Sequence, residues 1–147
     1  MNGYRLAKLK VCNLGCIGSD GVEITLDEIV CLVGANNSGK STMLRAYELA
    51  ATSGNLKPEE IFTRDITLHP TFVKQEATVE LWVHIPEGAE NIDRKWVEVV
   101  GTEQLVRSKW TWPIDGGKPN RTTWDPLESA YAENGKGLSR NYFYKLA

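Results

Sequence analysis

The sequence contains few cysteines and no long apolar run. Its three cysteines lie close together, at positions 12, 16 and 31, and this number is too small for a disulfide framework. The longest uninterrupted apolar run, residues 29–33, is far shorter than the roughly 20 residues that a membrane-spanning helix needs. The N-terminus also lacks the apolar stretch of a signal peptide. These absences predict a cytoplasmic protein, in a reducing compartment, with no membrane partner.

Neither sign of charge dominates the chain. The 147 residues include 17 lysines and arginines against 19 aspartates and glutamates, which gives a net charge of -2. This balance excludes a globally basic nucleic-acid binder but permits a local basic patch. Hydrophobic residues make up 41% of the chain and charged residues 24%, which are ordinary values for a globular domain. Length and composition therefore predict a single domain.

A glycine-rich loop follows the apolar run. Residues 29–33 are rich in β-branched side chains, which predicts a central strand covered on both faces. The loop residues that come next are Gly34, Ala35, Asn36, Asn37, Ser38, Gly39, Lys40, Ser41 and Thr42. From Gly34 to Ser41 they fit the phosphate-binding pattern GxxxxGK(S/T). Residues 43–51 favour a helix with Leu44, Tyr47 and Ala51 on one face, and Gly54 can end it.

The residue types of this loop suit a bound triphosphate. Glycines at positions 34 and 39 let main-chain N–H groups approach the phosphates at the positive end of a helix. Lys40 can reach the β- and γ-phosphates, and the Ser41 hydroxyl can coordinate Mg²⁺. Thr42 is expected to support the α-phosphate. The alternative interpretation, a helix N-terminus after a flexible glycine turn, leaves the Lys40-Ser41 pair unexplained. The whole loop is therefore the candidate ATP site, and Ser41 is the candidate Mg²⁺ ligand.

The segment VCLVGANNSGKSTMLRAYELA, residues 30–50, resembles the opening of the ABC-type ATPases of the OLD, RecF and SMC families. Their loop reads G-x-N-x-(S/A)-G-K-(S/T), and the close similarity covers roughly residues 4–54 of this chain. The resemblance implies an α/β fold of the P-loop NTPase type, namely an ABC-type head fragment with an antiparallel β-lobe. It also implies a head that binds ATP, dimerises around two nucleotides and acts in DNA repair, DNA processing or anti-phage defence.

Two parts of such a head are not found in the sequence. No apolar strand after the loop ends in Asp-Glu, and no LSGG-like signature is present. The resemblance therefore implies a single incomplete head over residues 1–147, in which hydrolysis needs a homo-oligomer partner or a missing ATPase half. It is divided into a strand pair, loop and helix (1–56), a β-lobe (57–125) and a C-terminal segment (126–147). Asp65 and Gln75 are the candidate catalytic residues, in a role like that of the Q-loop, against the alternative of a solvated loop.

The residue pattern predicts strands for most of the remaining chain. Residues 4–11 and 22–26 favour an antiparallel pair, and residues 77–85 alternate apolar and polar side chains as expected of a strand with one core face. Two more strands are predicted at residues 96–100 and 104–112, joined at a turn. Residues 57–62 predict a short helix with Pro58 at its first position. A further helix is predicted to begin after Pro126.

A local basic patch is predicted inside the β-lobe. Residues 104–124 hold four cations against a single acid and are interleaved with three tryptophans. The cations are Arg107, Lys109, Lys118 and Arg121. Cations beside aromatic rings can track phosphates and stack bases, which predicts DNA as a partner. The alternative is that the tryptophans belong to the core of the lobe or to a protein interface.

Two functions are consistent with these patterns. The first is an ATPase head that binds MgATP and hydrolyses it when completed by further chain or a partner. The alternative is a non-hydrolysing scaffold in which bound ATP holds an assembly together and regulates an effector protein such as a nuclease. A small-molecule kinase also begins with a phosphate loop, but the β-rich lobe and the Asn36-Asn37 pair disfavour it.

Overall fold

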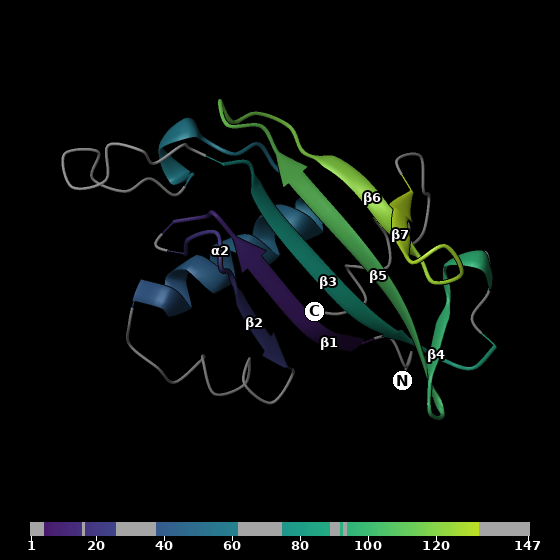
Figure 1. Ribbon diagram of the computed structural model, residues 1–147. Helices are drawn as coiled ribbons and strands as arrows, with labels where there is room; N and C mark the ends of the chain where they lie inside the picture. Colours follow the sequence, from purple (N-terminus) through teal and green to yellow (C-terminus); the bar gives the residue numbers. More distant parts are fainter. Residues whose placement is uncertain are drawn as a thin grey trace.

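The computed structural model describes residues 5–15, 17–25, 38–61, 75–88, 92 and 94–132 (Figure 1). The described strands are β1 (Arg5–Cys12), β2 (Val22–Thr25), β3 (Ala77–Ile85), β4 (Glu98–Val100), β5 (Glu103–Trp112), β6 (Asn120–Asp125) and β7 (Ala130–Ala132). The helices are α2 (Ser38–Thr52) and two short 3-10 helices, η1 (Pro58–Glu60) and η2 (Arg94–Trp96). The predicted strand at residues 29–33 lies outside the described residues.

The described strands form one antiparallel sheet in the order β2-β1-β3-β5-β6-β7, with β4 paired to β5. The predicted pairing of the first two strands is confirmed, with Leu9 opposite Ile24. β1 also pairs with β3, with Val11 opposite Val79. The opening strand pair and the strands of the predicted β-lobe are therefore parts of one sheet.

One face of the sheet, called here the inner face, carries the core. The predicted alternation of β3 is confirmed, because its five odd-numbered residues from Ala77 to Ile85 are buried. Trp110 and Trp112 of β5 are fully buried beside them. Helix α2 crosses this face (Figure 1), and the two indole N–H groups donate to Ser53 Oγ and to the carbonyl oxygen of Gly54, at the end of the helix. No helix of the described residues has both the length and the hydropathy for crossing a bilayer.

The buried face of helix α2 is not centred on the face that Leu44, Tyr47 and Ala51 share. Leu44 is 48% exposed, whereas Met43, Ala46 and Ala50 are buried, together with Leu49. Tyr47 and Ala51 are partly buried at the edge of the core. The buried stripe thus centres on Ala46 and Ala50, with Met43 and Leu49 beside them.

The chain after Pro126 does not begin a helix. The buried carboxylate of Asp125 accepts hydrogen bonds from the main-chain N–H groups of Leu127 and Glu128 at 3.1 and 3.3 Å. This local pairing closes a turn that leads into β7, so the prediction of a helix here is wrong. Two other elements are shorter than predicted: η1 covers three residues of the expected helix at 57–62, and β4 begins only at Glu98, after η2.

Candidate nucleotide-binding site

The N-terminus of helix α2 forms the described part of the candidate site. Residues 38–41 make up the first turn of this 15-residue helix, and the turn contains no acidic residue. The unpaired N–H groups at a helix N-terminus and the helix dipole favour an anion. An N-terminus free of carboxylates, with Lys40 in its first turn, therefore fits the phosphates of a nucleotide. Residues 34–37 of the predicted loop lie outside the described residues.

Gly15 lies against the helix directly beyond this turn. It has a positive φ of 55°, and its N–H donates to the carbonyl oxygen of Glu60 at 2.7 Å. A Cβ atom on Gly15 would stand 2.8 Å from Thr42 Oγ1. The connection after β1 therefore packs on Thr42, the predicted α-phosphate ligand, so closely that only glycine fits.

An ion pair holds the neighbouring segment to the same helix. Arg45 Nε donates to Glu60 Oε1 at 2.9 Å and Arg45 Nη2 to Glu60 Oε2 at 3.4 Å. The second carboxylate oxygen also accepts from the Lys57 main-chain N–H at 2.9 Å. Together with Leu14, Gly15 and Thr42, this pair lines a pocket of about 200 Å³. Helix α2, η1 and the connection after β1 thus meet at one small cavity beside the candidate site.

Substitution of Gly15 with alanine should destabilise the protein by roughly 2 to 4 kcal/mol, since backbone strain at positive φ adds to overpacking against Thr42. The matched control is Gly101→Ala, because Gly101 has a φ of 63° and no atom within 4 Å of its added Cβ. The control should cost only the backbone strain, roughly 1 to 2 kcal/mol. Urea denaturation measures both, and equal losses would show that Gly15 does not press on Thr42.

The Arg45–Glu60 pair should make stability depend on pH. Burial alone would raise the pKa of Glu60, but the hydrogen bonds from Arg45 and the Lys57 main chain outweigh it, and the pKa lies below its usual 4.5. A lowered pKa contributes stability above the unfolded-state value, and this contribution is lost as pH falls through the folded-state value. We expect Glu60→Gln to cost roughly 1 kcal/mol at neutral pH, and this cost to shrink as the pH falls through the lowered pKa of Glu60. The exposed neighbour Glu59, changed to Gln, serves as the control in the same denaturation series.

The two candidate catalytic residues have different outcomes. Asp65 lies outside the described residues. Gln75 is exposed and lies two residues before β3. The carbonyl oxygen of the adjacent Glu76 accepts a hydrogen bond from Asn13 Nδ2 at 3.3 Å. Gln75 therefore lies near the C-terminal end of β1, close to the connection that contains Gly15. Its catalytic role stays a prediction.

The four cations of the predicted basic patch are not brought together. Arg107 and Lys109 lie on the outer face of the sheet, the face opposite the core, as the register places them beside Trp82 and Glu80. Arg121 pairs with Trp110 on the inner face; its guanidinium lies 5.2 Å from that indole ring, and burial lowers its pKa to about 10. Lys118 is exposed in the turn before β6. The predicted patch therefore grouped cations that lie on two opposite faces of the sheet and in a turn.

Two further cations, which were not predicted from the sequence, lie on the outer face. Lys8 and Lys10 of β1 lie opposite Trp82 and Glu80 of β3. The signal was present, because these lysines alternate with the buried Leu9 and Val11. What the sequence alone did not show is that β1 pairs with β3, which places the lysines near Lys109.

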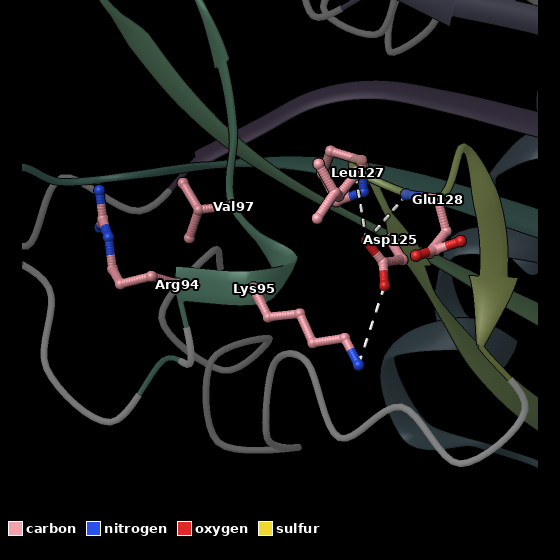
Figure 2. A pocket seen from close by; sticks show the side chains of 7 residues that line it. Arg94, Lys95, Val97, Asp125, Leu127 and Glu128 are labelled. Atoms are coloured by element: carbon pink, nitrogen blue, oxygen red, sulfur yellow. Dashed lines mark hydrogen bonds and ion pairs between the residues drawn. The ribbon is translucent and has the colours of Figure 1, made fainter.

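A larger cavity of about 620 Å³ lies between η2 and the turn from β6 to β7. Figure 2 shows the Asp125 carboxylate between the Lys95 ammonium and the main chain of Leu127 and Glu128. The Lys95 Nζ–Asp125 Oδ2 distance is 3.8 Å. Strand β6 runs antiparallel to β5 and ends at Asp125. The C-terminal ends of β1 and β5 lie at the other end of the strands, near α2. This cavity is therefore separate from the candidate nucleotide site. Nowhere in the described ranges do three or more His, Cys, Asp or Glu side chains gather to hold a metal ion.

Comparison with known proteins gives a family match over most of the described chain. Residues 5–109 match the family model described as "AAA ATPase domain". The chain is also similar to "Exonuclease subunit 2" of Enterobacteria phage T4, with 31% identity over 96 residues. This alignment covers 64% of the present chain and 16% of the phage protein, so the chain spans only a small part of that relative. No solved structure gives a significant match.

Proposed function

The chain belongs to the family of AAA ATPase domains, a nucleotide-binding family of the P-loop NTPase type, and we propose that it is part of an ABC-type head that binds ATP with Mg²⁺. The observation that carries this proposal is the position of the Gly39-Lys40-Ser41 sequence in the acid-free first turn of α2. A triphosphate needs both a ring of N–H donors and a cation at this place. The resemblance to the OLD, RecF and SMC group supports the ABC-type assignment.

Each residue of the loop has a proposed task. The main-chain N–H groups of the loop surround the phosphates, and Lys40 binds the β- and γ-phosphates. The Ser41 hydroxyl is the protein ligand for Mg²⁺, and Thr42 supports the α-phosphate. Bound Mg²⁺ supplies neutralisation of the phosphate charge. Gly15 and the Arg45–Glu60 pair hold the surrounding segments against the same helix.

Hydrolysis is proposed to need groups from outside this chain. Attack by water on the γ-phosphate requires a residue that orients the water and further positive charge at the transition state. The sequence has no apolar strand ending in Asp-Glu after the loop and no LSGG-like signature. A separate ATPase half would supply these groups, because a second copy of this chain has the same sequence.

The proposed biological role is nucleic-acid processing, within DNA repair or anti-phage defence. The name of the phage relative, an exonuclease subunit, supports a role beside a nuclease. Proposed partners are DNA and an effector protein such as a nuclease. In the alternative function, bound ATP holds this assembly together and is not hydrolysed.

Binding and turnover can be measured separately. Titration with a fluorescent ATP analogue, with and without Mg²⁺, tests the proposed site, and we expect tighter binding when Mg²⁺ is present. Phosphate release is then measured for the chain alone and with both single-stranded DNA and the partner ATPase half present. Tight binding without release in either condition favours the scaffold, release favours the ATPase head, and no binding of the analogue contradicts both.

A further inference from the structure

The outer face of the sheet carries alternating cations and aromatic rings. The strand register places Lys8 opposite Trp82, and Trp82 opposite Arg107. Trp124 of β6 follows on the same face, opposite Tyr131 of β7. The Arg107 guanidinium lies 4.6 Å from the Trp82 ring centre and 4.4 Å from that of Trp124. Cations and rings from β1, β3, β5 and β6 therefore form a continuous row across the sheet.

Arg107 fixes this row in place. Its Nη2 donates to Glu80 Oε1 at 3.0 Å, and the Tyr131 hydroxyl donates to the same oxygen at 2.6 Å. The Glu80 side chain is only 9% exposed, and that of Arg107 is 27% exposed. Arg107 is partly buried between the two indole rings, and its Nη2 is paired with Glu80. These contacts orient the rings, so we assign Arg107 a positioning role.

Three lysines lie on the same face, and two of them contact its rings: Lys8 Nζ lies 5.0 Å from the Trp82 ring centre, and Lys109 Nζ lies 5.3 Å from that of Tyr131. Lys10, Glu80 and Lys109 lie side by side on adjacent strands, and neither lysine forms an ion pair with another residue of the described ranges. Lys8 Nζ lies 3.7 Å from Glu23 Oε2, with side chains 36% and 49% exposed, and so exposed a pair contributes little. With Arg107 included, the centre of this face has four cations against the two acids Glu23 and Glu80. The excess is positive, in a chain whose net charge is -2.

We infer that the outer face binds single-stranded nucleic acid, with Lys8, Lys10 and Lys109 contacting phosphates and the half-buried ring of Trp124 contacting bases. This inference rests on the proposed role in nucleic-acid processing but not on the ATP site. Rings on a flat sheet can stack on bases that are unpaired, whereas the bases of a duplex present no free face to them. An acidic protein could pair its carboxylates with the lysines, but carboxylates would not stack on the aromatic rings.

The test measures the binding of a fluorescent oligothymidylate to the chain over a range of salt concentrations, without ATP. Each phosphate contact on a single strand contributes about -0.7 to the slope of log K against log salt, so three lysines predict a slope of about -2. The triple variant Lys8→Gln, Lys10→Gln, Lys109→Gln should bind roughly tenfold more weakly at low salt and lose most of this slope. The matched control changes three exposed lysines elsewhere, Lys57, Lys95 and Lys118, to Gln.

The outcomes separate this inference from the proposed function. The control triple and Lys40→Ala should bind the oligonucleotide as the parent does, and the outer-face triple should still bind the ATP analogue. If the outer-face triple unfolds, the single Lys109→Gln variant replaces it, with an expected slope change of about 0.7. Three results would overturn the inference: equal losses in both triples, no binding by the parent, or equally tight binding of a duplex or of polyglutamate.

Discussion

Replacement of Lys40 with alanine should weaken binding of a fluorescent ATP analogue by about tenfold or more. A charge-assisted hydrogen bond to a phosphate contributes about 1.5 to 3 kcal/mol, and a loss of about 1.4 kcal/mol is tenfold in affinity. Lys40 lies in the first turn of α2, where no other lysine or arginine and no acid is present. The chain therefore offers no described cation in that turn that could replace it.

The control for this experiment is Lys57→Ala. Lys57 is exposed at the start of η1. Its substitution with alanine removes the same charge as Lys40→Ala but lies outside the loop. Its affinity for the analogue should equal that of the parent. Unchanged affinity in the Lys40 variant, with an unchanged melting temperature, would contradict the proposed site. Equal losses in both variants would indicate an effect of net charge only.

Replacement of Trp112 with alanine should cost roughly 3 to 5 kcal/mol of folding stability, because it removes a large buried side chain and leaves a cavity in the core. Trp112 is completely buried, and its indole N–H donates to the carbonyl oxygen of Gly54 at 2.9 Å. It thus packs the inner face of β5 and also satisfies the main chain where α2 ends. A loss of this size is a large part of the total stability of a small domain.

Two variants separate packing from hydrogen bonding at this position. Trp112→Phe keeps much of the ring but leaves the carbonyl oxygen of Gly54 without its donor, for which we expect a loss of roughly 1 to 3 kcal/mol. Trp124→Ala, on the outer face, should cost less than Trp112→Ala because Trp124 is only half buried. Urea denaturation at neutral pH provides all three values. If Trp112→Ala cost no more than Trp124→Ala, the assignment of Trp112 to the core would be wrong.

Strand predictions succeeded where one side chain in two is apolar. The limits of β3 match the predicted residues 77–85, and β5 differs from its prediction by one residue. β6 and β7 were not predicted individually, since Asn120–Asp125 has one apolar side chain, Trp124, and β7 has three residues. β6 becomes a strand by pairing with β5, and β7 becomes one by pairing with β6. Their structure therefore depends on a neighbour distant in sequence.

The chemistry of the phosphate loop was already legible in the sequence. Glycine, lysine and serine at fixed spacing are required by the phosphates and need no knowledge of the fold. The family match over residues 5–109 supports a nucleotide-binding ATPase domain. The basic patch had no comparable local rule. Because successive strand residues point to opposite faces, Lys109 and Arg121 could be assigned to a face only once their strands were paired.

The sequence by itself predicted the nucleotide-binding loop and determined the strand periodicity, because each depends on residues that are neighbours along the chain. The tertiary structure decided which elements meet. The pairing of β1 with β3 joined two predicted units into one sheet and brought Lys8 and Lys10 beside Lys109. Packing placed Gly15 on Thr42 and Glu60 on Arg45. These contacts join residues far apart in the chain, and they arise only when the sheet and helix α2 bury their apolar faces against each other.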